Sequence, residues 1–448
     1  MTDADERKLK RSTLLTAVIS SFLAPYLSSA VNVALPAIQE DLSATAVQLS
    51  WTAASFVLVN AMLALPLGKA ADIWGRKRML AGGIATLTVS SVICCLVQDP
   101  RMLIALRAVQ GGASGAVAVT SMAIVTSVFP PEERGAAFGL VIAAVYTGLS
   151  AGPFVGGVLT GYFGWRSVFL SVALLGAVAF LWIVTRLKGE WADAAGQRLD
   201  VVGCLFYACG LFGIMYGASN LPGLRGAVLL AGGAGVIALF VRREYRVASP
   251  LLDMRLFSEN RVFAFSSLAA LIHYAAVFAV TMLMSLYLQF VKGLQPQIAG
   301  LVLLAQPVVQ AAFSPAAGRL SDRRDAGRVA SAGMAVTALG LVMLLLTGTG
   351  SSIGYVVSAL VILGFGYALF SSPNSNAIMG SVSRRHFGVA SSVVTTMRAV
   401  GMSMSMAVAT VMISIFVGEA AIGPDNIPAL LYAMRVCFAI SIVLCCIG

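Results

Sequence analysis

Long apolar runs alternate with short polar segments along the whole chain. A helix needs roughly 20 predominantly apolar residues to cross the hydrocarbon core of a bilayer. Measured against that length, the runs predict fourteen membrane spans, near residues 13–38, 50–71, 79–97, 102–127, 135–160, 166–185, 199–219, 223–241, 262–290, 297–318, 328–347, 352–379, 387–417 and 430–448. All connections are short, so the pattern predicts an all-α polytopic membrane protein without an extramembrane catalytic domain.

The composition agrees with a bilayer as the solvent. Hydrophobic residues make up 59% of the 448 residues and charged residues 11%, against about 25% charged residues in an ordinary soluble domain. A soluble domain could not bury that much apolar surface, because surface-to-volume scaling forces many positions outward. The seven cysteines lie inside apolar runs, with spacings that suit neither a zinc site nor a disulfide framework. We therefore predict no metal and no other cofactor.

The basic residues predict the orientation. The net charge of +11 is spread over short loops, which argues against a nucleic-acid partner. If the N-terminus is cytoplasmic, most basic residues fall on the cytoplasmic side, as the positive-inside rule requires. The exceptions are Arg101, Arg166, Arg225, Lys292 and Arg435 in outer loops, and Arg107 and Arg398 inside spans. We predict that both termini are cytoplasmic and that the membrane is the plasma membrane, which in a bacterium is the inner membrane.

The N-terminal segment Arg7-Lys8-Leu9-Lys10-Arg11 has the basic character of the start of a signal peptide. The apolar run after it continues for about 25 residues, which is longer than the apolar region of a signal peptide. We therefore predict an uncleaved first span.

Two polar loops share one pattern. The first, Gly68-Lys69-Ala70-Ala71-Asp72-Ile73-Trp74-Gly75-Arg76-Lys77-Arg78, lies between the second and third spans, and the second, Gly318-Arg319-Leu320-Ser321-Asp322-Arg323-Arg324, follows the tenth. In both, an aspartate stands four positions after a glycine and is followed by cations. Two copies at the ends of apolar runs indicate an internally repeated membrane transporter.

The first loop resembles the signature loop between spans 2 and 3 of the major facilitator superfamily of secondary transporters. Matching the two loops assigns residues 1–189 to one six-helix bundle, residues 190–247 to two inserted helices and residues 248–448 to a second six-helix bundle. This six-plus-two-plus-six order resembles the fourteen-span drug:proton antiporter branch. From the resemblance we expect a monomer that moves a small-molecule substrate across the lipid bilayer, with protons as the coupling ion.

The resemblance also implies that the loop locks the two halves in the outward-facing state. Asp72 and Arg76 lie one helical turn apart and can face each other, while Gly68 and Gly75 permit close helix approach and a tight turn. The remaining gating residues predicted from the two loops are Lys77, Gly318, Asp322 and Arg323. The alternative is that these charges serve only to set the topology.

Arg107 lies inside the fourth span, in Leu103-Ile104-Ala105-Leu106-Arg107-Ala108-Val109-Gln110. An arginine inside a span is costly and marks function by default, and Gln110 lies one turn away, where it can share hydrogen bonds. The segment resembles the span-4 motif of the family, whose arginine is implicated in proton transfer or in organising the central cavity. The alternative is snorkelling of Arg107 to the outer interface.

The fifth span contains Gly148-Leu149-Ser150-Ala151-Gly152-Pro153-Phe154-Val155-Gly156-Gly157. Gly148, Gly152 and Gly156 form a small-residue stripe that lets another helix pack closely, and Pro153 removes one backbone hydrogen bond and can kink the span. The segment, with Gly157, resembles the span-5 motif of the family's antiporters. Export is implied by that resemblance, whereas the residues alone predict a packing seam.

The first span ends in Val31-Asn32-Val33-Ala34-Leu35-Pro36, which resembles the span-1 motif of the branch and makes Asn32 a candidate cavity residue. The branch usually carries an aspartate five positions earlier, where this chain has Leu27. None of the nineteen acidic residues lies clearly in the middle of a predicted span. A proton antiporter needs a group that gains and loses a proton, so coupling would have to use another site. The missing carboxylate also weakens the case for cationic drugs.

Two cationic or titratable groups remain inside the later spans. His273 in the ninth span could titrate near neutral pH, although a hydrogen-bonded histidine between helices is the preferred interpretation. Arg398 in the thirteenth span would favour an anionic or zwitterionic substrate group if it faces the cavity, and snorkelling is the alternative. The segment 371–376, with Pro373 among serines and asparagines, predicts a broken helix at a cavity or helix contact.

Other classes of membrane protein fit the sequence less well. A primary pump needs a phosphate-binding loop ending in Gly-Lys-Ser/Thr, and Gly68-Lys69 is followed by Ala70. A channel would show a filter or pore-lining ring, and an enzyme or receptor would show a recognisable set of reactive groups. We therefore predict a non-enzymatic multidrug-type transporter that exports hydrophobic or amphipathic compounds by proton antiport. Export of an endogenous metabolite or lipid is the alternative substrate class, and a channel or receptor-like protein is the alternative from another class.

Overall fold

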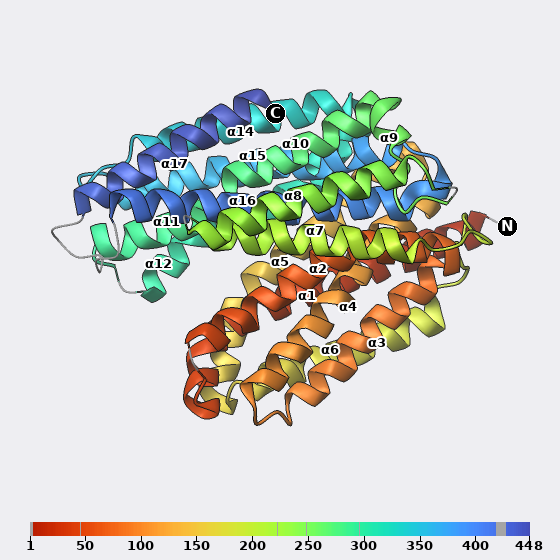
Figure 1. Ribbon diagram of the computed structural model, residues 1–448, viewed down its shortest axis with the longest axis horizontal. Coiled ribbons are helices and arrows are strands. Elements are labelled where there is room, and N and C mark those ends of the chain that lie inside the picture. Colours follow the sequence, from red (N-terminus) through yellow and green to blue (C-terminus); the bar gives the residue numbers. More distant parts are fainter. Residues whose placement is uncertain (1–2, 45, 222, 248, 295, 418–426) are drawn as a thin grey trace.

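The computed structural model describes residues 3–44, 46–221, 223–247, 249–294, 296–417 and 427–448 (Figure 1). Within these ranges the chain forms helices joined by turns and loops, without a strand. The helices are α1 (Asp3–Leu42), α2 (Ala46–Trp74), α3 (Arg76–Cys94), α4 (Pro100–Val128), α5 (Pro131–Phe163), α6 (Arg166–Arg186), α7 (Val201–Ser219), α8 (Leu224–Glu244), α9 (Arg255–Ser258), α10 (Arg261–Val277), α11 (Val280–Leu286), η1 (Tyr287–Val291), α12 (Pro296–Leu303), α13 (Ala305–Arg323), α14 (Ala326–Leu345), α15 (Ile353–Gly380), η2 (Arg384–His386), α16 (Phe387–Phe416) and α17 (Ile427–Ile447).

In the described ranges, thirteen helical segments are long and apolar enough to cross a membrane. One of them, Arg261–Val291, combines α10, α11 and η1, and another, Ile298–Arg323, combines most of α12 with α13. The predicted span at 79–97 corresponds to α3, which is helical but begins with three basic residues and is not among the thirteen. Each predicted span thus overlaps a helix, and the chain is an all-helical, multi-pass membrane protein.

The helices form two groups that meet at one end. In the first group α1 packs on α5, α2 on α4, and α3 on α4 and α6; in the second, α13 and α14 pack on α15, and α10 on α16. The groups touch through α5 with α13 and α15, and through α2 and α4 with α16. They converge at the end that holds the N-terminus, and their far ends diverge (Figure 1). The polar loops predicted as gating elements lie at the convergent end.

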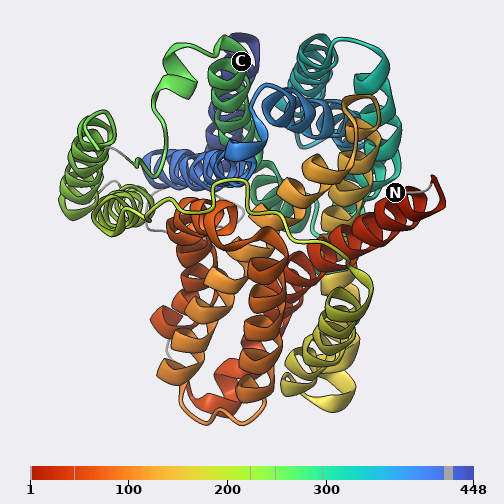
Figure 2. The same ribbon diagram turned by 90° about the vertical axis from the view of Figure 1, so that its right-hand side faces the viewer.

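The pair α7 and α8 lies beside this junction. The two helices pack on each other, and α7 also contacts α2 and α16. The preceding segment, residues 187–200 (called linker 187–200 below), crosses the convergent end of the molecule from α6 to α7 (Figure 2). The predicted boundaries at residues 189/190 and 247/248 fall in the segments that flank this pair, and the division into halves stays a prediction.

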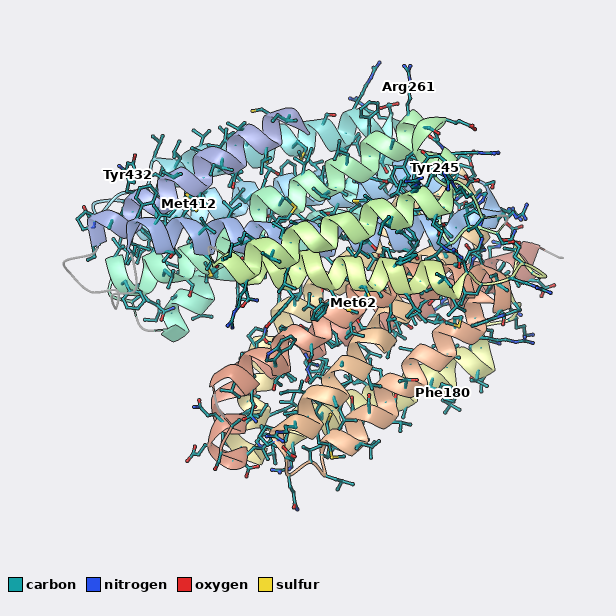
Figure 3. The ribbon with its side chains drawn as sticks, viewed as in Figure 1. Met62, Phe180, Tyr245, Arg261, Met412 and Tyr432 are labelled. Carbon is teal, nitrogen blue, oxygen red and sulfur yellow. The ribbon has the colours of Figure 1, made fainter. Side chains whose placement is uncertain are left out.

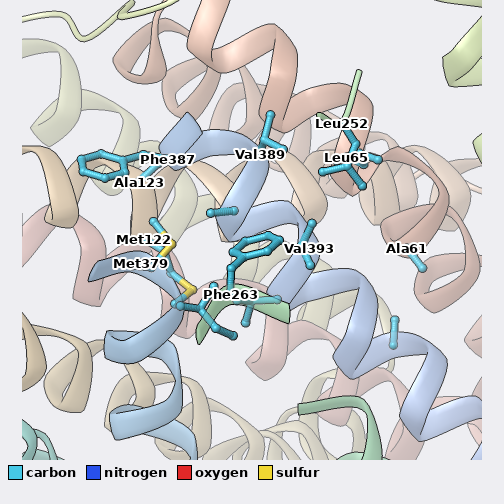
Figure 4. Close-up of a cluster of buried hydrophobic side chains, with 14 of the residues drawn as sticks. Ala61, Leu65, Met122, Ala123, Leu252, Phe263, Met379, Phe387, Val389 and Val393 are labelled. Atoms are coloured by element: carbon cyan, nitrogen blue, oxygen red, sulfur yellow. The ribbon is translucent and has the colours of Figure 1, made fainter. Parts of the chain in front are cut away.

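Apolar side chains hold the junction together on its inner side and meet the membrane on the outer side. Val389 and Val393 of α16 belong to one buried cluster with Leu65 of α2 and Met122 of α4 (Figure 4). On the outer surface, apolar side chains such as Phe180 are exposed and project away from the bundle (Figure 3). This arrangement suits a lipid environment, in which outward-facing apolar residues carry no cost.

The prediction of a broken helix around Pro373 is wrong. α15 continues from Ile353 to Gly380 through that proline. Pro373 lacks an N–H and cannot complete the intrahelical bond to residue 369, but the helix is held on both sides by neighbours. The Ser372 hydroxyl donates to the Gly135 carbonyl of α5 at 3.2 Å, and the Asn374 amide donates to the Ser266 carbonyl of α10 at 3.0 Å.

Candidate functional site

The carboxylate of Asp72, near the end of α2, caps the first turn of α16. The Gly388 N–H donates to Asp72 Oδ1 at 2.9 Å, and the Val389 N–H donates to Oδ2 at 3.2 Å. Asp72 is 0% exposed. A helix N-terminus presents free N–H groups and a partial positive charge, so a carboxylate there is stabilised. This contact joins the two groups of helices across 316 positions of sequence.

Arg76 binds the same carboxylate and is also fully buried. Its Nε and Nη2 donate to Asp72 Oδ1 at 3.0 and 2.7 Å. Its Nη1 donates to Ser127 Oγ and to Asp193 Oδ2, both at 2.8 Å, and Nη2 also donates to the Arg384 carbonyl at 2.7 Å. A buried ion pair is tolerated when its remaining hydrogen bonds are made, as they are here. Asp72 and Arg76 belong to the same group of helices, so the pair itself does not bridge the groups.

Linker 187–200 covers this loop from the solvent side. The Glu190 carboxylate accepts from the backbone N–H of Lys77 at 2.8 Å and of Arg78 at 3.2 Å, which caps the start of α3. The Lys69 ammonium donates to Gln197 Oε1 at 2.7 Å. The role of this linker is missing from the sequence-based predictions. Its two acidic residues, Glu190 and Asp193, are opposite in charge to the basic loop at 69–78, and this complementarity was the signal that could have indicated the contact.

Asp322, near the end of α13, makes a similar contact with α5, one turn further into the helix, at its fifth and sixth residues. The Gly135 N–H donates to Asp322 Oδ1 at 2.6 Å and the Ala136 N–H donates to Oδ2 at 2.8 Å. The Asn376 amide adds a longer bond to Oδ1 at 3.4 Å. In the described part of the chain, neither Asp322 nor Arg323 forms an ion pair. The second cap therefore resembles the first in its backbone contacts and differs from it in charge.

Glycines bring the helices close enough for both caps. A Cβ added at Gly68 would fall 2.5 Å from the Gly388 carbonyl oxygen, and one added at Gly318 would fall on the Gly135 carbonyl oxygen. Gly75 has a φ of 111°, which favours glycine. Gly388 and Gly135 were missed because nothing local marks them. Gly135 follows Arg134 near the start of α5, and Gly388 follows Phe387 at the start of α16. A comparison of these two N-terminal segments would have suggested both glycines.

Arg107 lies inside the first group of helices and does not reach the surface, being 0% exposed. Its Nε donates to the Thr52 carbonyl at 3.1 Å and its Nη1 donates to Gln110 Oε1 at 3.0 Å. Gln110 in turn donates to Ser91 Oγ at 3.1 Å. The guanidinium stands 4.3 Å from the centre of the Phe56 ring. Arg107 thus ties α4 to α2 and, through Gln110, to α3.

The glycine stripe of α5 faces α1. A Cβ added at Gly148 would lie 2.6 Å from the Phe22 carbonyl oxygen, one at Gly152 would lie 2.9 Å from the Ala30 nitrogen, and one at Gly156 would lie 2.8 Å from the Ala30 Cα. Each approach is closer than real Cβ atoms show. The stripe therefore lets the backbones of α1 and α5 approach closely, with the Ser29 hydroxyl of α1 donating to the Gly148 carbonyl at 3.3 Å.

Three further predicted residues lie apart from these contacts. Pro153 sits within α5, which continues to Phe163. A Cβ added at Gly157 would meet only Val33, at 3.8 Å, so this glycine is off the seam. Asn32 is exposed on α1. The structure brings none of the three into the hydrogen-bonded sets described above.

A central polar cluster, defined as Tyr146, Tyr274, Gln310, Ser371, Ser375 and Arg398, draws on five helices. Arg398 Nη2 donates to Ser375 Oγ at 3.1 Å, and its guanidinium lies 5.5 Å from the centre of the Tyr274 ring. The Tyr274 hydroxyl is 3.4 Å from that of Tyr146 and 3.5 Å from Ser371 Oγ. Because Tyr146 comes from α5 and the others from the second group, the cluster spans the junction.

His273 is buried among aromatic rings beside this cluster. Its ring stacks on Phe370 at 4.0 Å between centroids, and Nδ1 lies 3.2 Å from the sulfur of Met334. Nε2 has no partner among the described residues. A charged imidazole at this fully buried position would be costly, because no carboxylate of the described residues pairs with it.

The chain resembles known transporters along most of its length. The family model described as Major Facilitator Superfamily matches residues 17–406. Riboflavin transporter RibZ of Clostridioides difficile (strain 630) is 29% identical over 412 residues, covering 92% of this chain and 89% of that protein. Multidrug resistance protein Stp of Mycobacterium tuberculosis (strain CDC 1551 / Oshkosh) is 31% identical over 384 residues, covering 84% of this chain and 71% of that protein. The crystal structure of the human organic anion transporter MFSD10 matches with a TM-score of 0.69 and 16% identity, covering 99% of this chain and 100% of that chain, which shows the shared fold.

Proposed function

The chain belongs to the major facilitator superfamily of transporters, and from that premise we propose that it exports hydrophobic or amphipathic organic compounds across the plasma membrane, driven by proton antiport. It works as a monomer with both termini in the cytoplasm. Its two halves, residues 1–189 and 248–448, rock about the central polar cluster, with residues 190–247 as an inserted pair. The observation that carries the proposal is the pair of carboxylate caps, Asp72 on α16 and Asp322 on α5.

The caps suit a gate because they are strong enough to close one end and weak enough to be broken in each cycle. Each cap consists of two backbone N–H groups that donate to one carboxylate. A hydrogen bond to a charged group contributes about 1.5–3 kcal/mol. A conformational equilibrium of a few kcal/mol between two states is one that a ligand can shift.

Proton coupling would use a gate carboxylate and not His273. Protonation turns a carboxylate, which only accepts hydrogen bonds, into a group that must also donate. Such a change at Asp72 or Asp322 would weaken the contact with two N–H donors. Asp322 suits this role better, because no cation among the described residues holds it in the charged form. A substrate that carries the proton is the other route to coupling.

Two observations bear on the cargo. The relative Stp is named a multidrug resistance protein, which supports xenobiotic export. The relative RibZ is named a riboflavin transporter and covers slightly more of this chain, which supports a second candidate, transport of a polar heterocyclic metabolite. The polar cluster at the junction offers hydrogen bonds to either cargo.

Growth and accumulation assays separate these candidates. A host lacking its own exporters, expressing this chain, should resist some members of a toxic-compound panel, and a protonophore should abolish both the resistance and the lowered accumulation. Accumulation measured in everted membrane vesicles, with riboflavin added to the panel, tests the metabolite candidate. Resistance that survives the protonophore would contradict proton coupling. Unchanged accumulation of the whole panel would contradict export.

A further inference from the structure

The two arginines inside the membrane differ in how far the protein uses their hydrogen-bonding capacity. Arg107 is enclosed, with a backbone carbonyl, an amide and an aromatic ring as partners, although its Nη2 has no partner among the described residues. Arg398 is half-buried and, among the described residues, its side chain makes one hydrogen bond, to Ser375. Its Nε is shielded from solvent and has no partner among the described residues. A guanidinium offers five donors, so most of those on Arg398 remain for another molecule.

Within the part of the chain that the structure describes, no carboxylate pairs with Arg398. None of the ion pairs in the described ranges includes it. The wider sequence agrees, because none of its nineteen acidic residues lies in the middle of a predicted span. A cation at membrane depth without a counter-charge is costly, and residues of this kind mark substrate pathways. The site therefore carries an uncompensated positive charge.

The groups around Arg398 are also donors or aromatic faces. The Tyr274 ring lies against the guanidinium, and its hydroxyl approaches that of Tyr146 from the other group of helices. The Gln310 side chain is 0% exposed and lies beside the Tyr146 hydroxyl. Neither polar atom of its amide makes a hydrogen bond of ordinary geometry with a described residue. Buried amides are normally paired, so Gln310 is a second group that a ligand would satisfy.

Resting on the transport function above, we propose that the central polar cluster binds an amphipathic organic anion, with its carboxylate on Arg398 and its ring system against Tyr274. A carboxylate accepts two parallel hydrogen bonds from a guanidinium, which is the strongest pairing available to it. Gln310 and Tyr146 then bind polar groups on the body of the ligand. A lipophilic cation of the same shape is disfavoured, because it would face a like charge without a carboxylate to offset it.

The preference for an anion over a cation can be tested with two dyes that share a ring system and carry opposite charges. Carboxyfluorescein is an anion and rhodamine 123 is a cation, and both are built on a xanthene. Equilibrium dialysis against the full chain in nanodiscs of neutral phosphatidylcholine gives a Kd for each. We expect the anion to bind at least about tenfold more tightly than the cation, and Arg398→Gln to weaken anion binding by about tenfold to a hundredfold, as expected for loss of a charged hydrogen-bonded partner.

Two further variants protect the test from a folding artefact. Arg398→Lys keeps the charge as a compact point without the planar fork, and should bind the anion with a Kd between those of the wild type and Arg398→Gln. Arg435→Gln removes an exposed arginine of α17, whose closest polar contact is the Thr347 carbonyl at 3.5 Å, and should match the wild type. Tighter binding of the cation, no binding of the anion, or equal anion binding by wild type and Arg398→Gln would each overturn the proposal.

Proton-driven accumulation of the same dyes in everted vesicles separates this inference from the proposed function. Binding of the anion without any gradient-driven accumulation would overturn proton-driven export and leave the anion site in place. Accumulation of rhodamine 123 alone, unaffected by Arg398→Gln, would overturn the anion site and leave export in place.

Discussion

Replacing Asp72 with asparagine isolates what the first cap contributes to closing the cytoplasmic end. Asparagine keeps one acceptor oxygen and replaces the other with an NH₂ group, which cannot accept from Gly388 or Val389. One of the two bonds that cross between the groups of helices is therefore lost, and the other becomes neutral. The ion pair between Asp72 and Arg76 lies within one group of helices, so its loss acts on the open and closed states alike. The bond that Arg76 itself donates across the junction, to the Arg384 carbonyl, does not involve Asp72 and is kept.

The size of the effect follows from those two bonds. Charged hydrogen bonds contribute about 1.5–3 kcal/mol and neutral ones about 0.5–1.5 kcal/mol. Losing one charged bond and weakening the other destabilises the closed cytoplasmic end by about 2.5–4.5 kcal/mol, which shifts the equilibrium toward opening by roughly 60-fold to 1,600-fold. Asp322→Asn removes the same number of crossing bonds and should shift the equilibrium by a comparable factor. It should harm expression less, because no buried arginine loses its partner.

Spin labels on a cysteine-free background can measure this opening. Arg78 on α3 and Arg385 on η2 are exposed and lie on opposite sides of the cap, so double electron–electron resonance between them reports the separation of the groups. Asp72→Asn should add or enlarge a population at longer distance. Asp200→Asn is the matched control, because Asp200 caps α7 and pairs with Arg243 of α8 at 3.0 Å without crossing the junction. An unchanged distance distribution in Asp72→Asn would refute the assignment of the cap as a gate.

Three other substitutions test the remaining contacts. Arg107→Lys should abolish most transport and lower the free energy of unfolding of the purified protein by about 1–3 kcal/mol, because an ammonium cannot reach Thr52 and Gln110 while lying on Phe56. Wild-type stability and transport in this variant would contradict the prediction. His273→Gln should keep both gradient-driven accumulation and counterflow in proteoliposomes, and loss of accumulation alone would make His273 the coupling group. Gly152→Ala should destabilise the contact of α1 with α5 by about 1–3 kcal/mol, measured as a lower melting temperature, whereas Gly161→Ala on the same helix meets no atom within 4 Å and should be near neutral.

The helices and the outline of the fold could be predicted because the bilayer imposes a length on every span. Where polar residues or a proline interrupt an apolar run, the sequence alone does not determine whether the helix continues across the membrane. α3 begins with three basic residues and is the one predicted span that is not apolar enough by the criteria that the other thirteen meet. Pro373 indicated a break that the contacts of Ser372 with Gly135 and of Asn374 with Ser266 do not allow.

The candidate site was only half predictable, because sequence identifies a reactive group more easily than its partner. Asp72, Arg76 and Asp322 stood out by charge and spacing, but the residues that receive Asp72 and Asp322 are 316 and 187 positions away. They contribute backbone N–H groups, which leave no trace in side-chain chemistry. Arg107 and Arg398 could not be told apart from the sequence, since both are arginines inside apolar runs. Each has a donor without a partner among the described residues, and only the full burial of Arg107 and the half-burial of Arg398 separate a structural role from a binding role.

The ion pair that first drew attention in the sequence is better understood as a support for the gate than as the gate itself. Asp72 and Arg76 are four positions apart and stay together whichever way the molecule opens. Arg76 also binds Ser127 and Asp193 on its own side of the junction and the Arg384 carbonyl across it, and linker 187–200 adds Glu190 on the start of α3. These contacts hold the Asp72 carboxylate in a fixed position, where it can meet the N–H groups of α16 without reorganising. Among the described residues, Asp322 has no arginine of this kind beside it. Its carboxylate accepts from two backbone N–H groups of α5 and from the Asn376 amide. A transporter with one supported cap and one unsupported cap can break both in each cycle and use the second as the group that responds to a proton.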